Sequence, residues 1–151
     1  MTEQRYFDDV ETGEVVPPAR HIIEPVQMFL FSSATGNAHR IHYDHRWAQS
    51  EGYANIVVQG PLQSALMARL LTDWAGPRGR LVRIQVRNQA VAFAGEELVC
   101  TAAVVRTYRD GGAALIDLQL AVTRAGAEIL MPGTATVSLP CRADDAESEA
   151  R

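Results

Sequence analysis

The stretch that decides the fold is residues 60–76, GPLQSALMARLLTDWAG. Gly60 and Pro61 open it and Gly76 closes it, which is the usual punctuation of a helix. Its apolar side chains cover most of the helical circumference: Leu62, Ala65, Leu66, Ala68, Leu70, Leu71 and Trp74. A helix that is apolar on nearly all sides lies in the interior of a domain. The sequence therefore predicts one central buried helix over residues 61–75.

The pattern changes in kind after this helix. Apolar and polar residues now alternate with a period near two, which is typical of strands. Four segments have this pattern: residues 81–87, 97–108, 113–124 and 127–139. Residues 109–112, RDGG, and 125–126, AG, separate the last three and are typical of hairpin turns. A buried helix followed by an antiparallel meander predicts an α+β fold whose sheet wraps around the helix.

Shorter elements are expected in the first sixty residues. Residues 21–23 form a candidate short strand, and residues 1–17 carry no predicted element. A helix is predicted over residues 25–34, because Pro25 suits its first turn and Gly36-Asn37 suits its end. Residues 36–44 are predicted as a loop. Asp44 is then a candidate cap for a second short helix, residues 45–51.

Length and composition fit one globular domain. The chain has 151 residues, of which 47 % are apolar and 21 % are charged. We predict a single domain over residues 1–139. Residues 140–151, PCRADDAESEAR, are polar and acidic and are predicted to be a disordered tail.

Several classes of function are disfavoured. The net charge of −4 argues against a nucleic-acid partner. No apolar run approaches the roughly 20 residues that span a bilayer, and the first residues do not resemble a secretion signal. We therefore expect no membrane partner and a cytoplasmic location. The two cysteines, Cys100 and Cys141, have neither a disulfide framework nor metal-ligand spacing, so no metal site is predicted.

Residues 31–44, FSSATGNAHRIHYD, resemble the hydratase motif of the MaoC-like dehydratases, roughly F-[SA]-x-x-[ST]-G-D-x-N-P-x-H-x-D. They are most similar to the branch of type 2 hydroxyacyl-thioester dehydratases and mesaconyl-CoA hydratases. Residues 51–62 and 87–98 resemble two later family segments in the same order, and the resemblance covers about residues 6–139. It implies the hot-dog fold and a lyase activity on acyl thioesters. It also implies a hot-dog assembly, which is either a homodimer, a larger assembly or a heteromer with another hot-dog subunit.

The resemblance places four residues at the chemistry. Adding water to an enoyl thioester needs a base for the water, an acid for the α-carbon and a donor for the enolate oxygen. The family's catalytic histidine corresponds to His42. Asn37 stands where the family usually has Asp, and because Asn cannot accept a proton, His39 is expected to share the work. Gly60 N–H, at a helix N-terminus, is the expected oxyanion donor.

The remaining predicted site residues bind substrate. Val58 and Leu62 are expected to line an apolar tunnel for the acyl chain, together with Val57, Leu66 and Trp74. Arg40 and Arg87 are candidates for the phosphates of coenzyme A or of an acyl carrier, beside Arg78, Arg80 and Arg83. No cofactor is expected apart from the coenzyme A or carrier that is part of the substrate.

Two other functions remain open. The chain is alternatively a non-catalytic subunit of a heteromeric dehydratase, because Asn37 replaces the acidic residue of the family motif. It is alternatively a hot-dog thioesterase, although such an enzyme needs a carboxylate on the central helix. The first one there is Asp73, at the far end of that helix.

Overall fold

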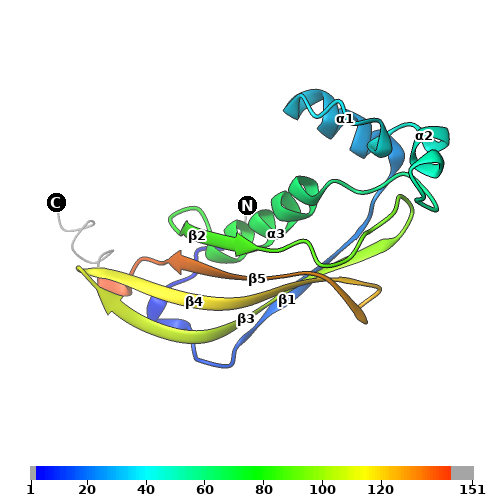
Figure 1. Ribbon diagram of the computed structural model, residues 1–151. Coiled ribbons are helices and arrows are strands. Elements are labelled where there is room, and N and C mark those ends of the chain that lie inside the picture. The colour runs from blue at the N-terminus through cyan, green and yellow to red at the C-terminus, as the bar shows by residue number, and fades with distance from the viewer. Residues whose placement is uncertain (1–2, 144–151) are drawn as a thin grey trace.

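The computed structural model describes residues 3–143 and has one five-stranded antiparallel sheet, in the order β1-β3-β4-β5-β2, with a long helix along one face (Figure 1). The strands are β1 (Val15–Ile22), β2 (Arg80–Val86), β3 (Glu97–Asp110), β4 (Ala113–Arg124) and β5 (Glu128–Ser138). The helices are α1 (Pro25–Thr35), α2 (His45–Ser50) and α3 (Gly60–Ala75), with 3₁₀ turns η1 (Phe7–Asp9) and η2 (Arg40–His42). This arrangement confirms the α+β, hot-dog prediction.

The core lies between α3 and the sheet. On β4 every second side chain is buried, as a period of two requires, and Ile116, Leu118 and Leu120 point inward. Burying one such side chain contributes about 1.5–3 kcal/mol. The prediction that α3 is buried on nearly all sides was wrong. Ala65 and Arg69 are exposed, because the sheet covers one face of the helix only.

Both predicted hairpin turns are confirmed. Gly111 and Gly112 alone connect β3 to β4, with φ values of 55° and 84°. Two positive φ values in a two-residue loop give a turn whose twist matches that of the strands. Ala125 and Gly126 begin the β4–β5 turn with φ values of 46° and 81°. Ala125 is the one non-glycine residue with positive φ in the described part of the chain.

The strand expected at residues 21–23 was predicted wrongly in extent. β1 begins at Val15 and includes Pro17 and Pro18. It is an edge strand, and its register with β3 shifts between Val16 and Ala19. Proline cannot donate to a ladder, so it is tolerated at such an edge and at a bulge. The two prolines are therefore part of the strand.

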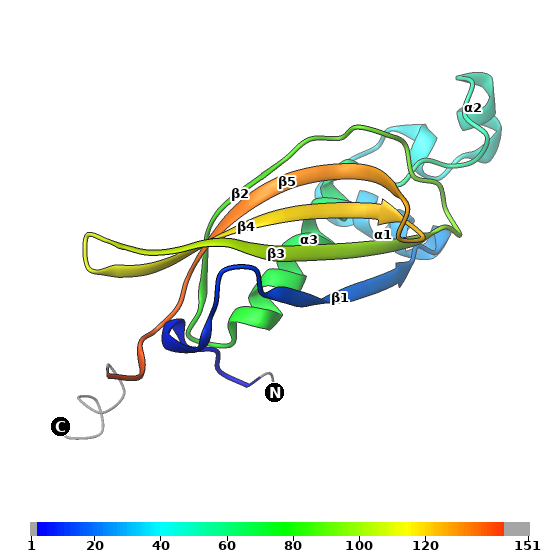
Figure 2. The same ribbon diagram turned by 90° about the horizontal axis from the view of Figure 1, so that it is seen from below.

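The helices before α3 follow their predicted caps. α1 ends at Gly36, which has a φ of 65°. The Asp44 side chain accepts a hydrogen bond from Trp47 N at 3.0 Å and caps α2. The loop prediction for residues 36–44 missed the single turn η2. Figure 1 shows α1 above the helical face of the sheet, over the beginning of α3, and in both views α2 lies farther out at that end of the sheet (Figures 1 and 2).

The end of the described chain packs against its beginning. Pro140 O accepts a hydrogen bond from Phe7 N at 3.0 Å, and Arg142 pairs with Asp9. The first residues of the predicted tail are thus ordered, whereas residues 144–151 lie outside the described part. None of the described helices is long and apolar enough to cross a membrane. Burial raises the pKa of the Cys100 thiol to about 11, as expected for a core cysteine.

Candidate functional site

His42 is held in one orientation and one tautomer. Its side chain is buried, and Nδ1 lies 2.6 Å from the carbonyl oxygen of Val57. A carbonyl oxygen only accepts hydrogen bonds, so Nδ1 must carry the hydrogen. In the neutral ring the lone pair then lies on Nε2. The fold therefore presents His42 Nε2 as a proton acceptor.

Residues 57–58 form the segment that holds His42, and hydrogen bonds fix this segment on both sides. Val57 N donates to Ile41 O at 2.9 Å, so η2 and this segment bind each other twice. Val58 N donates to Ala92 O at 2.8 Å, and a β-bridge joins Val57 to Phe93. The segment leads directly into α3. The position of His42 is thus coupled to the start of the central helix.

Gly60 is the first residue of α3. The first N–H groups of a helix have no intrahelical acceptor and lie at the positive end of the helix dipole. A Cβ atom at Gly60 would lie 2.4 Å from Asn88 Nδ2 and 2.8 Å from Asn88 Oδ1. The amide of Asn88 therefore covers this turn, and glycine leaves room for it. Asn88 belongs to a segment quoted for the resemblance, but sequence reasoning assigned it no role.

Asn37 and His39 shape the backbone that leads to His42. Asn37 Oδ1 accepts from His39 N at 3.3 Å, and His39 Nδ1 accepts from Ile41 N at 3.4 Å. The ring of His39 is exposed, and its centroid lies 6.1 Å from that of His42. The structure thus brings together three of the four predicted catalytic residues on one short segment.

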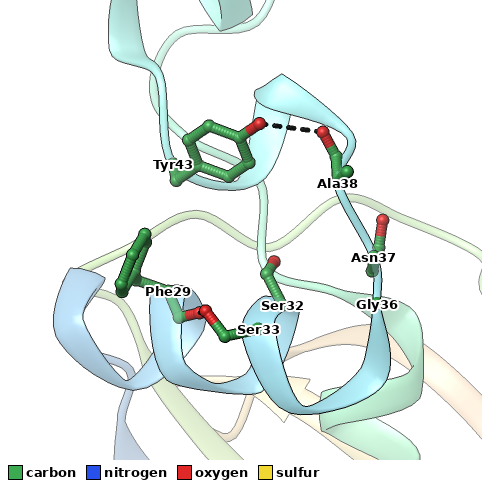
Figure 3. A pocket seen from close by; sticks show the side chains of 7 residues that line it. All are labelled: Phe29, Ser32, Ser33, Gly36, Asn37, Ala38 and Tyr43. Atoms are coloured by element: carbon green, nitrogen blue, oxygen red, sulfur yellow. Dashed lines mark hydrogen bonds between the residues drawn. The ribbon is translucent and has the colours of Figure 1, made fainter.

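A pocket of about 280 Å³ opens beside this segment, between α1 and residues 36–43 (Figure 3). The rings of Phe29 and Tyr43 meet edge to face at its mouth, with centroids 6.4 Å apart. Tyr43 donates its hydroxyl hydrogen to Ala38 O at 2.8 Å. The lining carries no charged side chain: Phe29, Ser32, Ser33, Gly36, Asn37, Ala38 and Tyr43. Its lining offers a ligand hydrogen bonds and apolar contacts.

Gln59 is a buried polar residue that sequence reasoning missed. It precedes Gly60 and is fully buried. Its Nε2 donates to Met28 O at 2.8 Å and to Ser32 Oγ at 2.9 Å, so it ties α1 to the start of α3. Its position at a predicted helix start, directly after an apolar run, was the available signal.

None of the four predicted substrate-binding residues lines this pocket. Val58 and Leu62 belong to the hydrophobic core and do not line the pocket in Figure 3. Arg87 is exposed, and its guanidinium donates to Gln89 Oε1 at 3.1 Å. The guanidinium of Arg40 lies 4.2 Å from the centre of the Trp47 ring.

Asp44 is committed to structural contacts. The Arg40 guanidinium donates to its carboxylate, with Nε 3.1 Å from Oδ2, and Trp47 N donates to Oδ1. These hydrogen bonds, that of Arg40 first, lower the pKa of Asp44. The carboxyl is therefore ionised and is not a source of protons near neutral pH. Within residues 3–143 no three His, Cys, Asp or Glu side chains come together as a metal site would require.

Comparison with known sequences finds a family profile and several relatives that match this chain. The profile of the family described as hydroxyacyl-thioester dehydratase type 2 matches residues 8–94. Mesaconyl-C(4)-CoA hydratase of Chloroflexus aurantiacus is 48 % identical over 86 residues, covering 56 % of this chain and 28 % of the relative. The chain thus spans little more than a quarter of the length of that relative.

Two further proteins are similar. The 3-oxo-4,17-pregnadiene-20-carboxyl-CoA hydratase beta subunit of Mycobacterium tuberculosis is 29 % identical, covering 56 % of this chain and 70 % of the relative. Among solved structures, the R-hydratase PhaJ1 of Pseudomonas aeruginosa superposes with a TM-score of 0.82 at 18 % identity, covering 91 % of this chain and 86 % of that one. At such identity the likeness is one of fold.

Proposed function

The chain belongs to the hydroxyacyl-thioester dehydratase type 2 family, and from this premise we propose that it catalyses the reversible addition of water to an enoyl thioester. The product is a 3-hydroxyacyl thioester of coenzyme A or of an acyl carrier. The observation that carries the proposal is the hydrogen bond between His42 Nδ1 and Val57 O, which leaves Nε2 as the base.

His42 performs both proton transfers in this mechanism. Nε2 takes a proton from water while the water oxygen attacks the β-carbon of the enoyl group. The imidazolium that forms is stabilised by the Val57 carbonyl, which accepts from Nδ1–H. The same ring then gives the proton to the α-carbon. One molecule of water has been added, and the histidine is again neutral.

Gly60 N–H supports the negative charge between these two steps. As water adds, charge builds on the thioester oxygen, and a donor at a helix N-terminus lowers the energy of that state. Losing such a donor typically raises the barrier by about 3 kcal/mol. Asn37 and His39 have an indirect role in this scheme, because they hold the turn that carries His42.

Arg40 or Arg87 binds the phosphates of the carrier group in this proposal, while Val58 and Leu62 support the acyl site from the core. No cofactor beyond the thioester itself is required. We also propose that the protein works as a hot-dog assembly. Both edge strands carry exposed apolar side chains, Val82 on β2 and Val15 and Ile22 on β1, but the two prolines of β1 remove backbone donors from that edge. The β2 edge is thus the better candidate for contact with a second subunit.

A second candidate function is that of a non-catalytic subunit in a heteromeric dehydratase. Asn37 favours it, because this side chain cannot exchange protons with His42. One relative is itself named as the beta subunit of a hydratase. A thioesterase role has less support, because Asp73 is exposed, paired with Arg69 and placed at the other end of α3 from Gly60.

Purified protein incubated with crotonyl-CoA and longer enoyl-CoAs separates these functions. Hydration is read as loss of the enone absorbance, and release of free thiol is followed in parallel. The proposal predicts hydration by this chain alone, without thiol release. Activity that appears only after addition of a second hot-dog protein would favour the partner-subunit function. Thiol release without hydration would favour the thioesterase.

A further inference from the structure

The hydroxyl group of Ser32 differs from the other hydroxyl groups of α1 in its hydrogen bonds. Ser33 Oγ donates to Phe29 O at 3.0 Å, and Thr35 Oγ1 donates to Phe31 O at 2.7 Å. Both bonds run to the carbonyl four residues earlier, which is the usual acceptor for a hydroxyl within a helix. The equivalent acceptor for Ser32 is Met28 O, and Gln59 Nε2 already occupies it.

Gln59 sets the role of the Ser32 oxygen. The atom beside Met28 O must be the amide nitrogen of Gln59, because two carbonyl oxygens cannot share a hydrogen bond. That nitrogen has two hydrogens, and the second goes to Ser32 Oγ. Ser32 Oγ therefore acts as an acceptor toward Gln59. Its own hydrogen has no acceptor among the residues that the structure describes.

Ser32 lines the pocket beside η2, the turn that contains His42. Only 6 % of the residue is exposed, and Figure 3 shows its oxygen directed into the space between α1 and residues 38–43. A buried hydroxyl without a protein acceptor is costly unless water or a ligand supplies an acceptor. Asn37 lines the same pocket; its oxygen is bound to His39 N, and its Nδ2 donates to no other described residue.

We propose that Ser32 O–H is a specificity-determining donor that binds an acceptor oxygen on the acyl group of the substrate, and that Gln59 positions it. The preferred substrate class is then a short acyl thioester with a second oxygen function, a carbonyl or carboxylate, beyond the thioester. The pocket volume of about 280 Å³ lies at the small end for ligand sites. This inference rests on the proposed function, because that function makes the ligand an acyl thioester.

Binding of two unreactive thioesters with four-carbon acyl groups tests the donor. Butyryl-CoA has no second oxygen function, and succinyl-CoA ends in a carboxylate. Isothermal titration calorimetry of the full chain should give a lower Kd for succinyl-CoA. Ser32→Ala should weaken succinyl-CoA binding about tenfold and leave butyryl-CoA nearly unchanged, as expected for one hydrogen bond to a charged acceptor.

Ser33→Ala is the matched control. Ser33 lines the same pocket, but its hydroxyl is bound to its own helix, so its loss should leave the preference intact. Gln59→Met frees Met28 O, so Ser32 can turn back and donate to it as Ser33 donates to Phe29 O. This variant should also lose the preference, and the Ser32→Ala/Gln59→Met pair should lose little more than either change alone.

The outcomes separate this inference from the proposed function. Equal or weaker binding of succinyl-CoA by the unmodified protein, or no binding of either thioester, overturns the role of Ser32. So does a preference that survives Ser32→Ala. Hydration of the matching unsaturated pair, crotonyl-CoA and fumaryl-CoA, is measured separately. A preference in binding without turnover would leave the Ser32 inference standing and remove the catalytic one.

Discussion

His42 Nδ1 lies 2.6 Å from the carbonyl oxygen of Val57, a residue fifteen positions later in the chain. This bond predicts different stabilities for two substitutions. His42→Ala leaves a buried carbonyl without a donor, at a cost of about 1–3 kcal/mol. The side-chain amide of His42→Asn can take the place of Nδ1–H, so we expect a loss of less than about 1 kcal/mol. Urea unfolding of both variants checks this. Equal losses would mean that the bond contributes nothing.

Gly60 and Asn88 should be coupled in stability. Gly60→Ala places a methyl group 2.4 Å from Asn88 Nδ2, so one of the two must shift. We expect a loss of about 1 kcal/mol for Gly60→Ala, at the low end for overpacking, because the amide end of Asn88 can turn away. In an Asn88→Gly background the same change should cost almost nothing. A double-mutant cycle of unfolding free energies measures the coupling, and additive effects would contradict the predicted contact.

Ala125 carries backbone strain that a glycine would remove. Its φ of 46° lies in the left-handed region, where a non-glycine residue loses about 1–2 kcal/mol. Part of the gain from Ala125→Gly is offset by the greater freedom of glycine in the unfolded chain. We expect a net stabilisation of about 0.5–1 kcal/mol, visible as a higher Tm. Ala127→Gly, in the same turn but at negative φ, is the control and should lower Tm.

His21 should make the protein less stable in mild acid. Burial, and secondarily the charge of Arg69, lower its pKa below the ordinary value of about 6.5. As pH falls below 6.5 the unfolded chain takes up a proton that the folded protein refuses. Stability is therefore lost from that pH down to the folded-state pKa. His21→Gln should show a smaller fall in Tm between pH 7 and pH 5 than the unmodified protein. Parallel curves would contradict the assignment.

The sequence predicted those elements whose ends are set by residues within a few positions. The α3 boundaries and the two hairpins follow from glycine and proline positions and from a period of two, all readable within a few residues. The extent of β1 could not be predicted from such signals. Pro17-Pro18 indicates an interruption of the strand unless the strand is known to lie at a sheet edge. That position is set by pairing with β3, about eighty residues later.

The candidate site was predictable from the sequence only where its residues belong to contiguous motifs. The motif around His42 and the glycine that begins α3 are contiguous patterns, and the structure places His42 beside the segment that leads to Gly60. The tautomer of His42 depends on Val57 O, and the free hydrogen of Ser32 depends on Gln59. These contacts join residues fifteen and twenty-seven positions apart, so no periodicity reveals them.

Comparison of kcat/KM between the unmodified protein and His42→Asn tests the role of His42 most directly. The substrate is crotonyl-CoA at neutral pH, and unfolding in urea shows that the variant is folded. Asn can keep the bond to Val57 O but has no basic atom in place of Nε2. Because acid–base groups contribute about 10²- to 10⁴-fold, we expect a loss of at least a hundredfold. Activity within tenfold of the unmodified protein would show that His42 is not the base.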